Sequence, residues 1–182
     1  MNSATHIMVT PVLFSGLICA IVAAAFTDVR SSRIPNWLTF SLAGFGVGVH
    51  SFSDGWSGFW FSVEGLILGI ICLLVFYANG GMGAGDVKFL GGIGAVVGSP
   101  AVLQVFLLTA LLGGVYAVAM MMYMGGGQYA WNRVITFFTT LLVMRRVPRA
   151  QIASGGEPKL RYALVIGLGT LLAQTFTWYD LF

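Results

Sequence analysis

The chain has 182 residues, of which 58% are hydrophobic and only 8% are charged. Charged residues make up about a quarter of an ordinary soluble domain, so this composition excludes such a domain and predicts an integral membrane protein. The net charge of +3 does not indicate nucleic-acid binding, because the positions of the basic residues are those of a membrane topology signal.

Apolar runs separated by polar or glycine-rich breaks predict six transmembrane helices in a single domain, 1–182. About 20 apolar residues span the hydrocarbon core as a helix. The first run is expected to be such a span and not a cleavable signal peptide, because no basic residue precedes it and it is long enough to cross. In chain order the predicted spans are 8–27, 37–50, 58–77, 86–97, 101–124 and 162–178. The predicted fold class is an all-α polytopic membrane protein with short loops.

Two features of the second half refine this topology. The run 89–132 has no charge and is too long for one crossing. Gly98-Ser99-Pro100 divides it, because glycine and proline interrupt helices and proline is tolerated at a helix start. The segment 129–144 is too short to cross and is flanked by arginines, so we expect it to lie at the membrane interface before the last helix. The 125–160 loop is expected to be peripheral to the chemistry and to contact lipid headgroups or the pilus machinery.

The lysines and arginines orient the predicted helices. With six crossings, all of these residues fall on one face of the membrane. The positive-inside rule makes that face cytoplasmic and places both termini outside, and anionic headgroups attract the same charges. The basic residues are Arg30, Arg33, Lys88, Arg133, Arg145, Arg146, Arg149, Lys159 and Arg161.

Among the acidic residues, only Asp28 and Asp86 lie at cytoplasmic ends of predicted transmembrane helices. Charged groups in a membrane are costly and are functional candidates by default. Either aspartate alone could equally cap a helix or pair with an arginine, but two at the same depth on different helices favour a catalytic pair. The other acids are predicted in outer loops, in the outer part of the third span or in the large cytoplasmic loop: Asp54, Asp180, Glu64 and Glu157.

A pair of neighbouring carboxyl groups has a well-defined chemistry. Two carboxylates close together cannot easily both ionise, so one holds a proton while the other accepts one. That division suits the activation of a water molecule for attack on a peptide carbonyl, with the protonated partner assisting at the carbonyl oxygen. The glycines before Asp86 allow close approach of another chain, although they would be equally ordinary in a flexible turn.

Two stretches of sequence carry a resemblance to a known family. Asp28-Val29-Arg30-Ser31-Ser32-Arg33-Ile34-Pro35-Asn36 and Gly83-Ala84-Gly85-Asp86-Val87-Lys88 resemble the two signature stretches of type IV prepilin peptidases, which are GxGD intramembrane aspartyl proteases. The resemblance extends over the whole chain in the order and spacing of spans and motifs. It implies that Asp28 and Asp86 are the catalytic pair. It also implies supporting or substrate-binding roles for Arg33, Pro35, Asn36, Gly83, Gly85 and Lys88.

The resemblance implies a substrate and a location. Proteins of this family cleave the short basic leader from prepilins after a leader glycine, at the cytoplasmic face of the membrane. Prepilins or pseudopilins and membrane lipids are thus the expected partners, the bacterial inner membrane is the expected location, and no nucleic acid, metal or cofactor is expected. The alternative is a non-enzymatic transporter or pilus-assembly scaffold that uses the two aspartates to bind a cation. Transporters usually show an inverted repeat and polar groups near the midplane, and the sequence indicates neither.

The chain differs from the bifunctional members of this family. Those members carry a cytoplasmic insertion with paired CxxC motifs and also N-methylate the new terminus, whereas Cys19 and Cys72 are the only cysteines here and form no CxxC. Both cysteines are expected to be buried as small hydrophobes, although a disulfide stays open. The compact form resembles the dedicated peptidases of the tight-adherence (Flp) pilus. An archaeal preflagellin peptidase is similar in chemistry and remains an alternative.

Other polar and aromatic residues have simpler expectations. His6 and His50 are expected at the outer interface, and the tryptophans near span ends fit the aromatic belts of membrane proteins. Met120, Met121, Met122 and Met124 are expected to pack or face lipid and not to bind copper. Glu64 is expected either to extend outward or to bond to a neighbouring helix.

Overall fold

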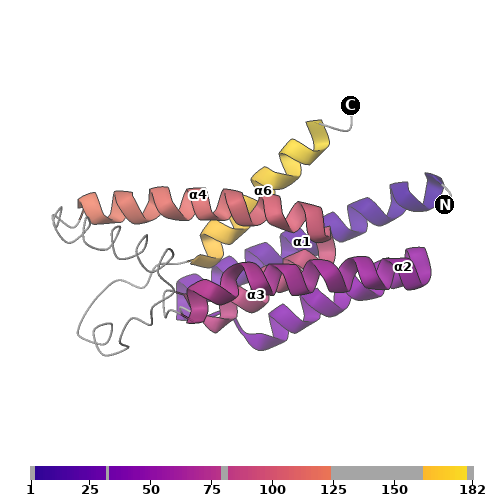
Figure 1. The fold of residues 1–182 in the computed structure, drawn as a ribbon, viewed down its shortest axis with the longest axis horizontal. Helices are drawn as coiled ribbons and strands as arrows, with labels where there is room; N and C mark the ends of the chain where they lie inside the picture. The colour runs from indigo at the N-terminus through magenta and orange to yellow at the C-terminus, as the bar shows by residue number, and fades with distance from the viewer. Residues whose placement is uncertain (1–2, 32, 79–81, 124–161, 180–182) are drawn as a thin grey trace.

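The computed structural model describes residues 3–31, 33–78, 82–123 and 162–179. Its secondary structure is helical, as predicted, and the described residues contain no strand. The helices are α1 (Ser3–Ser31), α2 (Asn36–Ala78), α3 (Ala84–Val97), α4 (Ser99–Tyr123) and α6 (Tyr162–Tyr179), and they form an elongated bundle (Figure 1). The segment 129–144, predicted to be interfacial, lies outside the described residues.

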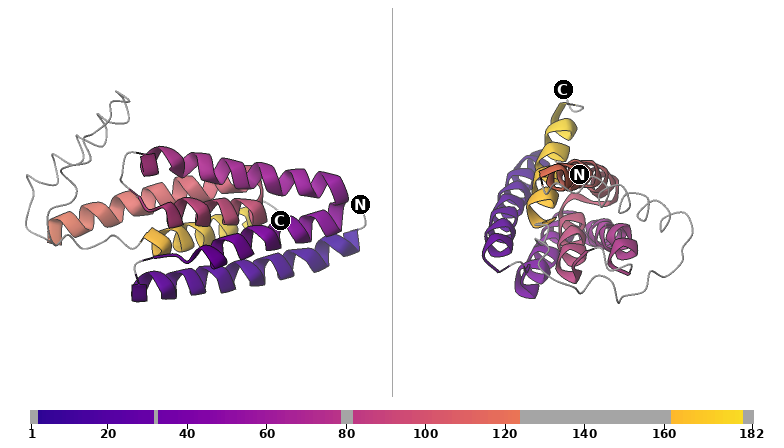
Figure 2. Two further views of the ribbon diagram at one scale, coloured as in Figure 1. Left: turned by 90° about the horizontal axis from the view of Figure 1, so that it is seen from below. Right: turned by 90° about the vertical axis from the view of Figure 1, so that its left-hand side faces the viewer.

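Helix α2 contains two of the predicted spans, because it reverses direction at Gly55. This glycine has φ 61° and ψ −131°, a conformation that residues with a Cβ rarely adopt. Both limbs contact the C-terminal part of α3, since Gly46 lies against the backbone of Ala95 and Gly65 against that of Gly94. The limbs therefore form a helical hairpin (Figure 2). The turn-rich connection expected between the two spans is reduced to a reversal at a single residue.

Three of the described helices are long and apolar enough to cross a membrane: Pro11–Ser31 of α1, all of α2, and Ser99–Tyr116 of α4. Helix α6 carries the shorter apolar stretch Tyr162–Thr175. The 14 residues of α3 make a helix about 21 Å long at a rise of 1.5 Å per residue, which is shorter than the hydrocarbon core of about 30 Å. The topology of six complete spans stays a prediction.

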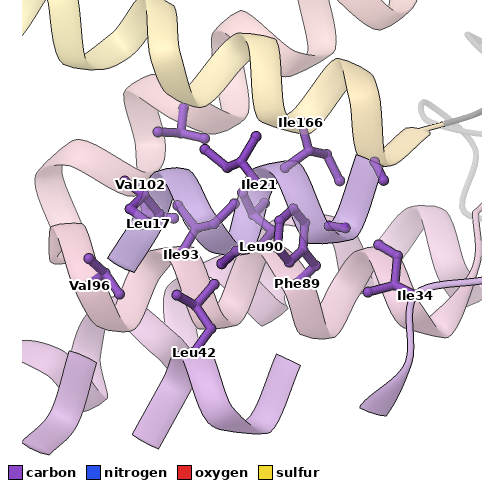
Figure 3. Close-up of a cluster of buried hydrophobic side chains, with 14 of the residues drawn as sticks. Leu17, Ile21, Ile34, Leu42, Phe89, Leu90, Ile93, Val96, Val102 and Ile166 are labelled. Carbon is purple, nitrogen blue, oxygen red and sulfur yellow. The ribbon is translucent and has the colours of Figure 1, made fainter. Parts of the chain in front are cut away.

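Helix α3 is the central element of the bundle. From Val87 to Val96 every residue except Lys88 is buried. Its apolar side chains pack against α1, α2, α4 and α6 in one core (Figure 3), whose labelled members are Leu17, Ile21, Ile34, Leu42, Phe89, Leu90, Ile93, Val96, Val102 and Ile166. Because protein surrounds α3, the helix does not need to cross the bilayer alone.

Glycines allow α2 to pack closely on α3. A Cβ at Gly65 would collide with the carbonyl oxygen of Gly94, and a Cβ at Gly69 would lie 2.6 Å from the carbonyl oxygen of Leu90. Small residues at helix interfaces let membrane helices approach closely and gain van der Waals contact. The spacing of Gly65 and Gly69, one helical turn apart, therefore determines which face of the second limb of α2 contacts α3.

Two polar side chains of α2 hold the C-terminal end of α3. The Ser62 hydroxyl donates to the carbonyl oxygen of Ala95 at 2.5 Å, and His50 Nε2 donates to that of Val96 at 2.9 Å. The last carbonyls of a helix have no partner within the helix, so these bonds satisfy them. The His50 ring is half-buried and packs edge-on against Phe61, with centroids 5.0 Å apart, and its place at the outer interface stays a prediction.

Two tryptophans near the predicted span ends are exposed, as expected for an aromatic belt. Trp56 and Trp60 are exposed and lie beside the Gly55 reversal, where Trp56 stacks on Phe59 at 5.2 Å between centroids. Such a cluster is typical of a membrane interface.

The expectation of two buried cysteines is wrong for Cys19, which is exposed. Cys72 is half-buried, and both thiols are free. Glu64 is also exposed, which favours its outward orientation.

The two signature stretches lie at the same end of the bundle. At this end α1 gives way to α2, the second limb of α2 gives way to α3, and α6 begins, while α4 extends beyond the other helices (Figure 2). The reversal at Gly55 and the junction at Gly98 lie at the opposite end. This alternation of helix directions brings Asp28 and Asp86 to one side of the molecule.

Candidate active site

Asp28 lies on the inward face of α1. Leu17, Ile21 and Ala24 precede it at helical spacing, and all three are buried, so the face that packs in the core also carries the carboxylate inward. Asp28 is only 7% exposed. Its Oδ2 accepts a hydrogen bond from the backbone N–H of Ala163 at 3.3 Å. A buried carboxylate needs such donors, and this one comes from the first turn of α6.

Asp86 lies in the first turn of α3 and is half-buried. Its Oδ2 accepts a hydrogen bond from the backbone N–H of Gly83 at 3.2 Å. Gly83 precedes the helix in an extended conformation, with φ −78° and ψ 148°. A carboxylate at this position satisfies a donor at the helix start and is favoured by the helix dipole. Because a Cβ at Gly83 would lie 3.1 Å from Asp86 Oδ2, the glycine allows this close approach.

The two carboxylates interact with each other. Asp86 is partly buried, and the Asp28 carboxylate lies close enough for its negative charge to act on Asp86 as well. The structure thus brings together the two aspartates that the sequence singled out, from helices that are not consecutive in the chain. They form two carboxyl groups at one end of the bundle, each bound to a backbone N–H.

The remaining residues of the signature stretches join α3 to the start of α2. Gly85 faces Ile34, since a Cβ at Gly85 would lie 3.3 Å from Ile34 Cβ and 3.4 Å from its carbonyl oxygen. Lys88 Nζ donates to Asn36 Oδ1 at 3.0 Å and lies 5.5 Å from the centroid of the Phe40 ring, within the range of a cation–π interaction. These contacts fix the position of the start of α2 relative to the first turns of α3.

Pro35 and Arg33 have different environments. Pro35 directly precedes α2, and its carbonyl accepts a hydrogen bond from the Leu38 N–H at 3.1 Å, so the helix starts where the sequence predicts. Arg33 is exposed and lines an open cavity of about 520 Å³ at the α1–α2 connection, whose other lining residues are Thr27, Ser31, Ile34, Pro35, Asn36 and Trp37. Arg33 thus lies outside the core.

Ala163 is the residue of this site that sequence reasoning missed. It contributes only its main-chain N–H, so the identity of its side chain carries no signal. The one indication in the sequence is its place at the start of the last predicted span, on the same face of the membrane as the aspartates. Among the described residues, no group of three His, Cys, Asp or Glu side chains could hold a metal ion. The functional groups that the site presents are two carboxyl groups.

The fold and the site are those of a helical membrane protein whose apolar helices carry two aspartates at one end of the bundle. The sequence model of the type IV leader peptidase family matches residues 15–118, which is more than half of the chain and includes both signature stretches. The chain belongs to that family, a family of proteases whose general function is prepilin-type leader cleavage. No curated protein and no solved structure matches the chain significantly.

We expect the Lys88–Asn36 hydrogen bond to contribute about 1 kcal/mol to stability, the usual net contribution of such a bond. A double-mutant cycle of Lys88→Met and Asn36→Leu, followed by denaturant unfolding in detergent, measures the coupling directly. Lys88→Met also removes the contact with Phe40, whereas the coupling energy isolates the bond to Asn36. Strictly additive effects of the two changes would contradict this expectation.

Proposed function

We propose that the protein is a membrane-embedded aspartyl endopeptidase that removes the basic leader from type IV, Flp-like prepilins, with Asp28 and Asp86 as its catalytic pair. The observation that carries this proposal is the placement of the two carboxylates at the same end of the bundle, each bound to a backbone N–H. Membership of the leader peptidase family supplies the reaction class. Two carboxyl groups can supply the general acid and the general base that peptide hydrolysis requires.

The reaction that we infer is hydrolysis of one peptide bond by water. The ionised carboxyl group accepts a proton from water as the oxygen attacks the carbonyl carbon, and the protonated carboxyl group donates to the carbonyl oxygen. Collapse of the tetrahedral intermediate re-forms the carbonyl and returns a proton to the carboxyl group that had donated one. The C–N bond breaks, and the amine leaves with a proton from the carboxyl group that had accepted one from water. The pair then again holds one proton, so the cycle balances without a cofactor.

The Flp type of substrate is proposed from the compactness of the chain. Only 32–35 separate α1 from α2, which leaves no room there for the methyltransferase insertion of bifunctional peptidases. We further propose that the end carrying the two aspartates faces the cytoplasm, because all basic residues are predicted there. A prepilin leader would then reach the pair from the cytoplasm while the apolar helix of the substrate stays in the bilayer.

The direct test is incubation of the purified protein with an Flp-type prepilin in detergent. We expect a shift in mobility equal to the leader, and mass spectrometry should locate the cut after the leader glycine. A prepilin with that glycine replaced by a bulky residue is the matched control and should stay intact. Absence of cleavage, together with saturable cation binding at the pair, would instead support the transporter or scaffold alternative.

The orientation has its own expected result. A reporter that is active only in the cytoplasm should be inactive when fused after Phe182, because six crossings place both termini outside. The same reporter inserted in the 125–160 loop should be active and serves as the positive control. Activity of the fusion after Phe182 would contradict the proposed topology without touching the chemistry of the pair.

A further inference from the structure

The contact between Asp28 and α6 links the proposed catalytic pair to a part of the chain that the family match does not include. The match ends at residue 118, whereas the N–H that binds Asp28 Oδ2 belongs to Ala163. Ala163 is fully buried, and its N–H lies in the first turn of α6, where helix N–H groups have no partner within the helix. Asp28 supplies a partner that this turn requires.

The position of α6 is fixed by packing along its length. Ala163 and Ile166 are fully buried. A Cβ at Gly167 would lie 2.7 Å from Ile21 Cγ2 on α1, and one at Gly169 would lie 2.9 Å from the backbone nitrogen of Thr109 on α4. Helix α6 is therefore packed closely on both α1 and α4 just after its first turn, and that turn presents the N–H of Ala163 to Asp28.

We propose that the first turn of α6 is the third component of the peptidase site, in which the Ala163 N–H is a positioning group that holds the Asp28 carboxylate toward Asp86. The inference rests on the proposed function and adds a residue to it. Asp86 has its own support from Gly83. Asp28 lies in the last turns of α1, far from the start of that helix, so its N–H donor comes from another helix.

Loss of this bond should affect the chemical step more than substrate binding. Catalytic groups displaced by about 1 Å can lose on the order of 100-fold in rate. We therefore expect kcat for leader cleavage to fall roughly 10- to 100-fold without the Ala163 N–H, while KM changes little. Substrate binding depends on other surfaces of the molecule.

Replacement of Ala163 by lactic acid during cell-free translation tests this directly, because it exchanges the N–H for an ester oxygen and leaves the methyl side chain. The matched control exchanges the N–H of Leu164 for an ester oxygen in the same helical turn. Ala163→Gly, which keeps the N–H, is the conservative variant and should retain wild-type kcat. Thermal unfolding in detergent shows whether both ester variants are equally folded.

We expect the Ala163 ester to lose kcat with KM unchanged, and the Leu164 ester to stay within about threefold of wild type. Equal kcat of the two esters, at equal stability, would overturn the proposal. A failure of the proposed function is distinguishable, since the wild-type protein would then not cleave at all. If wild type cleaves, Asp28→Asn does not, and the Ala163 ester is fully active, only the role of α6 is refuted.

Discussion

Asp28→Asn and Asp86→Asn should each abolish leader cleavage, with a loss of at least 100-fold and up to about 10⁴-fold, the range that general acid–base catalysis contributes. An amide can neither hold the shared proton nor accept one from water. The fold should survive, because the asparagine oxygen can still accept the N–H of Ala163 or of Gly83. Cleavage of prepilin by the purified variants in detergent measures the loss, with circular dichroism as the check on folding.

Asp54→Asn and Glu64→Gln are the matched controls. Asp54 adjoins the Gly55 reversal at the far end of the bundle, about 28 Å of helix from Asn36 at 1.5 Å per residue, and Glu64 is exposed on the second limb of α2. Both variants should cleave at the wild-type rate. Full cleavage by Asp28→Asn or by Asp86→Asn, at wild-type protein levels, would remove that residue from the mechanism.

Gly65→Ala should destabilise the bundle by about 3 kcal/mol, the upper part of the usual range for overpacking. The added Cβ would collide with the carbonyl oxygen of Gly94, and Gly98 also lies within 3.0 Å. These are backbone atoms of buried residues, so no side-chain rotation relieves the clash, and α2 has to move away from α3. The midpoint of denaturant unfolding in detergent measures the effect, and cleavage should fall with it because α3 carries Asp86.

Gly48→Ala is the matched control on the same helix. No atom lies within 4 Å of a Cβ at Gly48, and alanine is favoured over glycine in a helix by up to about 1 kcal/mol. This variant should therefore be as stable as wild type or slightly more stable. If Gly65→Ala and Gly48→Ala unfold at the same denaturant concentration, the close packing of α2 on α3 is not a determinant of stability.

The helices and the candidate pair could be predicted from the sequence because charged and helix-breaking residues are rare in this apolar chain. Charges are so rare that Asp28 and Asp86 are conspicuous, and Gly98-Ser99-Pro100 separates α3 from α4 where the sequence predicts a break. The reversal of α2 was predicted only as a broad turn. Several small polar residues there could each have formed it, and the left-handed conformation of Gly55 follows from how the two limbs pack on α3.

Burial could not be read from the sequence in the same way. In a membrane, side chains that face lipid and side chains that face the core are equally apolar, so α3 has the composition of a span although protein surrounds it. His50 was placed at the outer interface because it ends the second predicted span, and this position gave no indication of the carbonyl on α3 that tertiary packing brings to its ring. Cys19 was expected inside and lies outside for the same reason.

The sequence by itself determined the membrane class, the helical fold and the two aspartates, because hydropathy and the cost of a charge in lipid are local properties of the chain. Only the tertiary structure decided that α3 is central, that Lys88 binds Asn36 and that Ala163 binds Asp28. The last contact uses a main-chain N–H, which every residue except proline possesses. Its place in the site therefore depends on where packing puts α6 and not on which residue stands there.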